Sequence, residues 1–129
     1  MCNINMPPKI VKLAQLISQY EGNGPNDRAT RNNNPGNCRY SSVGYLAKYG
    51  NVKKDKDGFA IFPSMSIGWM YLENLLLYWA KGPKKDYTIL EMMREYAPTA
   101  DNNDPVAYAR FIRKGMGVEP TVRLKDLLV

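Results

Sequence analysis

The segment from Ile67 to about Ala80 is the most hydrophobic stretch of the chain and the one that most restricts its fold. Apolar residues occur on almost every side of this segment when it is drawn as a helix, and only Glu73 and Asn74 give it a polar face. A helix that is apolar nearly all round must be buried by other elements. Gly82 and Pro83 supply a stop signal. A helix lying on a membrane surface is the alternative, and the small polar face argues against it.

The chain before this segment predicts one further helix and a small β region. Periodic apolar residues indicate a helix over about 9–21, after a short lead of residues 1–8. Residues 22–37 form a loop rich in Gly, Asn, Pro and Arg. Short apolar groups and a turn signal at Asp55–Gly58 then favour an irregular β-hairpin or loop region over 38–62.

Capping patterns predict the remaining helices. Thr88 begins a capping box that opens a helix to about Tyr96. Asp104, with a proline after it, opens another helix, which two glycines are expected to end. A short helix near the C-terminus completes the set. At 129 residues the chain is long enough for one domain with its own core, so we predict a mainly α single domain over residues 1–129.

Glu21 stands at the end of the apolar stripe of the first helix. It follows Ile17 by one turn, where a core residue is expected, and Gly22 is a natural residue to end the helix. Partial burial and the negative end of the helix dipole both raise the pKa of a carboxylic acid in this position. A carboxylic acid that stays protonated near neutral pH can act as a general acid. The alternative is an ordinary solvated glutamate at a helix end.

The loop after Glu21 combines turn-forming residues with side chains that make hydrogen bonds. These side chains are suited to the hydroxyl and acetamido groups of a ligand. The alternative is that the asparagines only stabilise turns. The residues concerned are Arg28, Arg31, Asn32, Asn33, Asn34, Asn37 and Arg39, beside Gly22, Gly24, Pro25, Pro35 and Gly36.

Composition excludes several kinds of site. The chain has no histidine, which removes His-based triads and most catalytic zinc sites. Cys2 and Cys38 are too few for a cysteine metal cluster, and Cys38 lacks a histidine to activate it as a nucleophile. A disulfide between the two cysteines and two free thiols are both open. We therefore expect no metal and no cofactor.

The net charge is +6 and the pI is about 9.3, which favours an anionic partner. Nucleic acid, an acidic membrane surface and an anionic cell-wall polymer all fit. No stretch reaches the ~18 apolar residues that a membrane span needs. The N-terminus also lacks the apolar core of a secretory signal. We expect a protein made in the cytoplasm without membrane insertion, which something else carries outside if it acts there.

Four groups of residues in this chain form recognisable motifs. They are Glu21-Gly22, the run RNNNPGN at 31–37, the run GFAIFPS at 58–64 with Gly68, and the late runs YAP at 96–98 and DNNDP at 101–105 with Tyr108. Together they resemble a family of phage-associated, lysozyme-like muramidases that borders on the lytic transglycosylases. The resemblance covers about residues 10–128. The late runs are also similar to the tyrosine-bearing segment of bacterial β-N-acetylglucosaminidases, which share the fold.

This resemblance implies a lysozyme-like fold and a glycosidase that degrades peptidoglycan. The bond cleaved would be the β-1,4 link between N-acetylmuramic acid and N-acetylglucosamine, with Glu21 as the general acid and base. The residue after NPGN is commonly apolar in the family and is Cys38 here. Core packing is the alternative role for the two tyrosines of the late motifs. The substrate-binding residues implied by the motifs are Arg31, Asn34, Gly36, Asn37, Tyr96 and Tyr108.

A second catalytic carboxylate is not evident in the sequence. Asp27, Asp101 and Asp104 are candidates, but Asp104 is better explained as a helix cap. We therefore expect Glu21 to act alone, first as acid and then as base. Water or the muramyl 6-hydroxyl would complete the reaction, and both outcomes stay open.

Bacterial peptidoglycan is the expected partner, together with other virion proteins if the chain is part of a virion. We expect a monomer unless it is assembled in a virion. Two other functions are alternatives. One is a noncatalytic wall-binding or virion structural module, which Glu21 argues against. The other is a basic nucleic-acid-binding domain, which ranks low because the aromatic residues gather in the segment expected to be buried.

Overall fold

The computed structural model describes residues 6–43, 46–97 and 102–129 of the chain. It is mainly helical, with a small two-stranded antiparallel sheet. Within those ranges, no helix combines the length and the apolar content that crossing a membrane requires. The elements in chain order are α1 (Pro8–Glu21), α2 (Arg28–Arg31), β1 (Lys53–Lys54), β2 (Ala60–Ile61), α3 (Met65–Lys81), α4 (Ile89–Tyr96) and α5 (Pro105–Met116), with 3-10 helices at Tyr40–Ser42, Leu46–Tyr49 and Leu124–Leu128.

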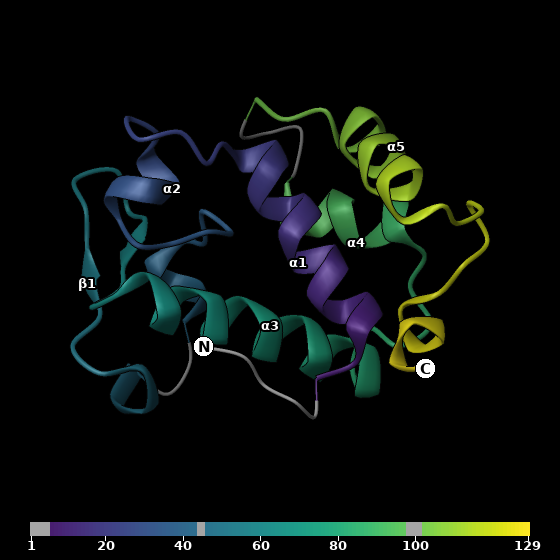
Figure 1. Ribbon diagram of the computed structural model, residues 1–129, viewed down its shortest axis with the longest axis horizontal. Coiled ribbons are helices and arrows are strands. Elements are labelled where there is room, and N and C mark those ends of the chain that lie inside the picture. Colours follow the sequence, from purple (N-terminus) through teal and green to yellow (C-terminus); the bar gives the residue numbers. More distant parts are fainter. Residues whose placement is uncertain (1–5, 44–45, 98–101) are drawn as a thin grey trace.

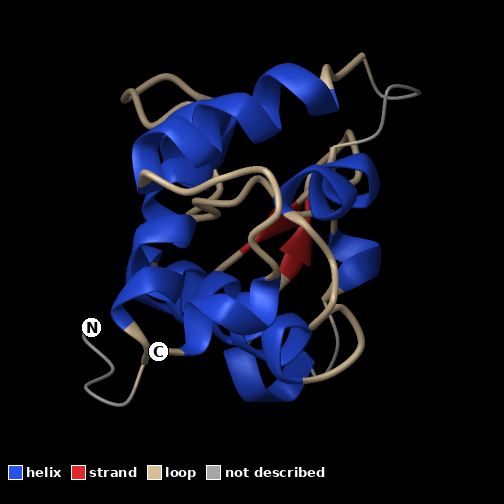
Figure 2. Cartoon of the chain, turned by 90° about the vertical axis from the view of Figure 1, so that its right-hand side faces the viewer, coloured by secondary structure: helices blue, strands red, loops and turns tan. Residues whose placement is uncertain are grey.

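In Figure 1, α1 runs obliquely through the middle of the molecule and α3 runs across the lower part, and the two helices approach each other near the beginning of α1. In that view α2 and β1 lie to the left of α1, and α5 lies to its right. α1 packs against both α3 and α5, α4 packs against α5, and the 3-10 helix Leu124–Leu128 packs against α3. Figure 2 shows how small the sheet is beside the helices. The site described below lies where the loop and sheet region meets the helices.

α3 is the apolar helix expected from the sequence, and its start is fixed by a cap. The Ser64 hydroxyl accepts a hydrogen bond from the backbone N–H of Ile67, at 3.2 Å. The expectation that the helix is buried all round is wrong, because Tyr78 is 63% exposed. One face is fully buried and several other apolar side chains are only half-buried. The buried residues of α3 are Gly68, Tyr71, Leu72, Leu76 and Ala80.

The other helix ends mostly follow the predicted signals. The capping box of Thr88 opens α4, and the Asp104 carboxylate accepts from the N–H of Ala107 at the start of α5. One expected stop is wrong, because α5 runs through Gly115 to Met116. A Cβ atom at Gly115 would lie 2.5 Å from Cδ2 of Leu16. This glycine therefore allows α5 to approach α1 closely instead of ending the helix.

The expected β region is present but very short. β1 and β2 pair antiparallel, with Lys53 opposite Ile61 and Lys54 opposite Ala60. The turn between them is held by Asp55, whose Oδ1 accepts hydrogen bonds from the N–H groups of residues 57 and 59, each at 2.9 Å. The loop before the sheet contains α2, a single helical turn that the sequence did not predict.

Asn34 fastens this loop to the sheet. Its Nδ2 donates to the carbonyls of Cys38 and Ala60, both at 2.9 Å, and its Oδ1 accepts from the N–H of Cys38 at 2.9 Å. The same loop is pressed against α3 at Gly68, where a Cβ atom would lie only 1.9 Å from the carbonyl oxygen of Asn33. Contact between backbone and backbone at this point sets how closely the loop and α3 approach.

The first prediction concerns this contact. We expect Gly68→Ala to lower the free energy of unfolding by about 1–3 kcal/mol or more, because the added methyl group must displace backbone instead of a flexible side chain. Urea unfolding followed by circular dichroism measures this. Lys81→Ala, at an exposed position in the last turn of the same helix, is the control and should change stability by no more than about 0.5 kcal/mol. Equal stability of Gly68→Ala and the wild type would contradict the close approach.

Candidate active site

The carboxyl group of Glu21 is held between two side chains from distant parts of the chain. Tyr108 of α5 donates its hydroxyl to Oε2 at 2.7 Å, and Nδ2 of Asn37 donates to Oε1 at 3.4 Å. Burial raises the pKa of Glu21 above its ordinary value, and the two hydrogen bonds oppose this rise without cancelling it. A carboxyl group with a raised pKa is suited to donate a proton near neutral pH.

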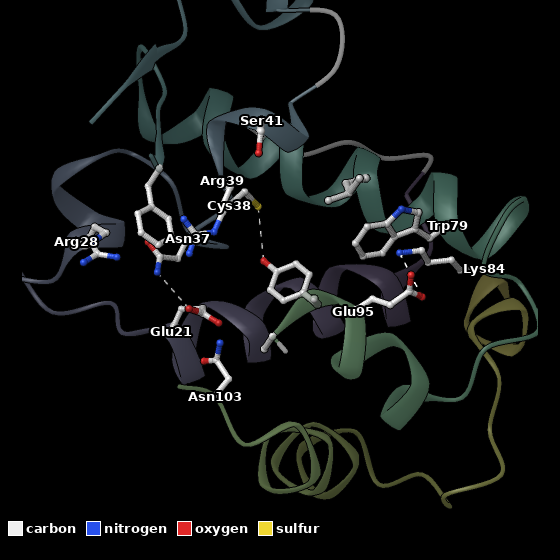
Figure 3. A pocket seen from close by; sticks show the side chains of 14 residues that line it. Glu21, Arg28, Asn37, Cys38, Arg39, Ser41, Trp79, Lys84, Glu95 and Asn103 are labelled. Carbon is white, nitrogen blue, oxygen red and sulfur yellow. Dashed lines mark hydrogen bonds and ion pairs between the residues drawn. The ribbon is translucent and has the colours of Figure 1, made fainter. Parts of the chain in front are cut away.

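Glu21 lines a cavity of about 530 Å³, a size in the usual range for small-molecule sites. Figure 3 shows the labelled side chains around it, with Glu21 and Arg28 at one end and Trp79 and Lys84 at the other. The walls come from the end of α1, from α2 and the loop after it, from the turn before β2, from α3 and the turn after it, and from the end of α4 and the segment that leads to α5. The lining residues are Glu21, Arg28, Asn37, Cys38, Arg39, Ser41, Phe59, Leu75, Trp79, Lys84, Glu95, Tyr96, Ala97 and Asn103.

Tyr108 is fixed in position behind Glu21. It is fully buried, and its ring stacks on Tyr20 with 3.9 Å between the ring centroids. Tyr96 meets the same ring edge-on, at 6.4 Å. Burial and the neighbouring Glu21 carboxyl raise the pKa of Tyr108, so the phenol keeps its proton. Tyr108 therefore acts as a hydrogen-bond donor to Glu21.

Asn37 contacts the carboxyl oxygen of Glu21 that Tyr108 does not contact. Its backbone is left-handed, with φ of 49°, a conformation that asparagine tolerates better than most residues. Its Nδ2 makes the contact with Glu21, while its Oδ1 is buried and has no hydrogen-bond partner among the described residues. A buried amide oxygen without a partner is uncommon in folded proteins. The same side-chain amide contacts Glu21 through its Nδ2.

Cys38 and Gly36 pack beneath Tyr96. The Tyr96 hydroxyl donates to the carbonyl of Gly36 and lies 3.6 Å from the Cys38 sulfur. A Cβ atom at Gly36 would lie 2.6 Å from that hydroxyl oxygen, so a larger residue does not fit. Burial raises the pKa of the Cys38 thiol to about 12, which leaves it without nucleophilic thiolate. Cys38 is a free thiol, and Cys2 lies outside the described residues.

The residues expected in the site fall into two groups. Three of them, Glu21, Asn37 and Tyr96, line the cavity, and Tyr108 contacts Glu21 from behind. The remaining three do not line it. Asn34 and Gly36 are buried beneath the wall, and Arg31 is exposed on α2, where it donates to the carbonyl of Asn26.

The carboxylates considered beside Glu21 make local contacts. Asp27 accepts a hydrogen bond from the N–H of Gly24 at 2.8 Å, and Asp104 caps α5. Asp101 lies outside the described residues, as does Pro98 of the late motif. Among the residues that are described, no three His, Cys, Asp or Glu side chains are grouped in a way that could hold a metal ion.

Several lining residues were not expected from the sequence. Trp79 and Leu75 belong to the segment predicted to be wholly buried, and they face the cavity instead. The segment contains more large apolar residues than one core-facing stripe of a helix needs, and this excess was the signal that some of them could face a cavity. Lys84 lies in the turn after α3 and Glu95 in the last turn of α4, and no motif includes either residue. They approach each other because the chain folds back between α3 and α4, which the local sequence patterns do not encode.

Comparisons of the chain with protein-family models, with curated proteins and with solved structures found no match. The mainly helical architecture is seen directly in the structure. The lysozyme-like fold and the muramidase family stay predictions that rest on the motifs.

The second prediction concerns the Tyr108 hydroxyl. A hydrogen bond to a carboxylate stabilises its charged form, so Tyr108→Phe should raise the pKa of Glu21 further. Titration of the Glu21 side-chain carboxyl by ¹³C NMR measures this. Tyr78→Phe, which removes an exposed hydroxyl on α3, is the matched control and should leave that pKa unchanged. A lower pKa in Tyr108→Phe would contradict the arrangement.

The third prediction links Glu21 to stability. The pKa of Glu21 is higher in the folded protein than its ordinary value of 4.5. Above pH 4.5 the unfolded chain therefore loses this proton first, and the folded state holds more protons than the unfolded state. Wild-type stability should therefore fall, relative to Glu21→Gln, between pH 4.5 and the folded pKa. Below pH 4.5 the difference should be constant. Thermal unfolding of both proteins from pH 3 to pH 8, roughly the range of this titration, tests it. A relative gain by the wild type as pH rises would reverse the sign and contradict the raised pKa.

Proposed function

We propose that this chain is a peptidoglycan-cleaving glycosidase, with Glu21 as its general acid and base. The observation that carries the proposal is a carboxyl group of raised pKa, held by Tyr108 and Asn37 in the wall of a ligand-sized cavity. The motif resemblance supports the substrate, the β-1,4 link between N-acetylmuramic acid and N-acetylglucosamine. The resemblance also supports a lysozyme-like fold.

The first step is proton donation from Glu21 to the glycosidic oxygen. As the bond to that oxygen breaks, the sugar carbon gains oxocarbenium character. Glu21 is then a carboxylate, and the hydrogen bonds from Tyr108 and Asn37 stabilise its charge. The carboxylate next acts as a base and removes a proton from the attacking hydroxyl. Burial thus favours the acid form before the step, and the two donors favour the base form after it.

A mechanism with a single carboxyl group fits the described residues better than one with a pair. Asp27 and Asp104 already accept backbone hydrogen bonds, and Glu95 is ion-paired with Lys84 at 3.8 Å. The attacking group is then water, as in a lysozyme, or the muramyl 6-hydroxyl, as in a lytic transglycosylase. The second choice leaves an anhydro sugar at the end of the product.

The setting of the reaction is also part of the proposal. The substrate is bacterial peptidoglycan, and the family resemblance favours a virion-associated protein, or one exported with help, that acts in the periplasm or cell wall. No nucleic-acid partner is invoked, and neither a metal nor a cofactor takes part in the proposed steps. The cavity and its acid group are complete within one chain, so a monomer suffices.

The fourth prediction tests this function by digesting purified peptidoglycan with the wild type and with Glu21→Gln. Soluble muropeptides should appear with the wild type, and release by Glu21→Gln should fall by roughly 10²-fold or more, because general acid–base catalysis contributes about that much. Mass spectrometry of the products separates hydrated ends from anhydro ends. Glu119→Gln, an exposed glutamate outside the cavity, is the matched control and should cleave like the wild type.

Other outcomes would change the proposal in distinct ways. A folded wild type that binds walls but releases nothing would indicate the noncatalytic wall-binding module. Equal cleavage by the wild type and Glu21→Gln would mean that the acid lies elsewhere, and Asp27→Asn would be the next variant.

A further inference from the structure

The end of the cavity that holds Trp79 and Lys84 has a chemistry of its own. The Lys84 ammonium lies 4.0 Å from the centroid of the Trp79 ring and 5.8 Å from that of Tyr87. Its side chain is only 18% exposed, although it belongs to a surface turn after α3. In Figure 3, Trp79, Lys84 and Glu95 lie together at the right of the cavity, away from Glu21. A cation is therefore held over an aromatic floor inside the cavity.

The charge of Lys84 is only partly balanced by its neighbour. The distance from Nζ to Oε2 of Glu95 is 3.8 Å, which is longer than a hydrogen bond. Glu95 is half-exposed, with 50% of its side chain accessible, and its carboxylate also accepts the Tyr87 hydroxyl. Water therefore weakens its pull on Lys84. The ammonium group keeps donors for an oxygen atom of a ligand.

The cavity as a whole favours a negative ligand. Its lining contains three basic residues, Arg28, Arg39 and Lys84, and two carboxyl groups, one of which is Glu21 with its raised pKa. Arg28 pairs with the carboxylate of Asp57, and Arg39 donates to the carbonyl of the same residue. Both arginines are thus engaged with the turn of the sheet. Lys84 is the basic residue best placed to meet a ligand at the opposite end.

We infer that this end of the cavity binds a carboxylate carried by the peptide substituent of the glycan. Lys84 donates to the carboxylate, and the apolar surfaces of Trp79, Leu75 and Tyr96 receive the aliphatic part of the peptide. This inference rests on the proposed function, because it names the form of peptidoglycan that the site selects. The carboxylate is the reason to choose the peptide, since acetamido and hydroxyl groups of the sugars carry no charge for Lys84 to meet.

The inference predicts opposite effects on ligand binding when the charge of Lys84 or that of the neighbouring Glu95 is removed. If Lys84 and Glu95 only form a stabilising ion pair, removing either charge should affect ligand binding in the same direction. If Lys84 binds a ligand carboxylate, removing its charge weakens binding. Removing the charge of Glu95 then strengthens binding, because Glu95 repels the ligand and competes for the ammonium group.

The fifth prediction is tested by titrating the protein with a GlcNAc–MurNAc disaccharide that carries its peptide. This probe lacks the MurNAc–GlcNAc bond and is not consumed. The indole N–H resonance of Trp79 in ¹⁵N NMR spectra reports binding at this end of the cavity. Lys84→Met, which keeps the length of the side chain over Trp79, should weaken binding roughly tenfold or more, because charge-assisted hydrogen bonds contribute about that much. Glu95→Gln should bind the probe more tightly than the wild type. Lys84→Arg, which keeps the positive charge, should bind it about as tightly as the wild type.

The ligand control is the same disaccharide-peptide with its carboxylates amidated. The wild type should bind it about as weakly as Lys84→Met binds the free acid. Equal affinity of the wild type for the two ligands, or a change of the same sign in Lys84→Met and Glu95→Gln, would overturn the inference. The outcome is independent of cleavage, because binding is measured on a probe without the scissile bond. Cleavage of walls with no preference for the charged ligand would leave the glycosidase standing and remove only the carboxylate site.

Discussion

The side-chain amide of Asn34 makes the hydrogen bonds on which the site depends. It joins the backbone on both sides of residue 38 to β2, and it does so from a fully buried position. Three hydrogen bonds to backbone groups fix the turn that carries Gly36 and Asn37. Because Tyr96 rests on Gly36 and Asn37 contacts Glu21, the geometry of the acid follows from this amide. The polar groups of the loop are used to shape it, and only some of them reach the cavity.

The position of Glu21 has an energetic consequence for the whole domain. A carboxyl group at the end of an apolar stripe loses hydration, and its raised pKa expresses that loss. The surrounding core offsets the cost: α1 buries Ile10, Leu13 and Ile17 on the same face. The protein can hold a poorly solvated acid because the rest of that helix is well packed. The apolar side chains that stabilise α1 and the carboxyl group of raised pKa therefore lie at adjacent turns of the same helix.

Much of the fold was predictable from local chemistry, and the site only in part. Threonine and aspartate signals predicted the starts of α4 and α5, and Gly22 predicted the end of α1, because caps act within one helical turn. The spacing of apolar residues in the first helix predicted that Glu21 lies at the end of its apolar face. The roles of Gly115 and Asn34 could not be read in this way, since each depends on a partner far along the chain. The role of Lys84 depends on how the turn after α3 folds back over Trp79 and towards Glu95. A glycine that ends a helix and one that admits a neighbouring helix look alike in a sequence.

The hydrogen bond between Glu21 and Tyr108 joins residues that are 87 positions apart. Closing so long a loop is slow compared with forming local turns, so this contact should form late in folding. Before α5 has docked, Glu21 lacks the Tyr108 hydrogen bond and part of the burial that set its pKa in the folded protein. The raised pKa of Glu21 is thus a property of the finished tertiary structure. Because of this contact, the ionisation of Glu21 reports whether α5 has docked against the end of α1.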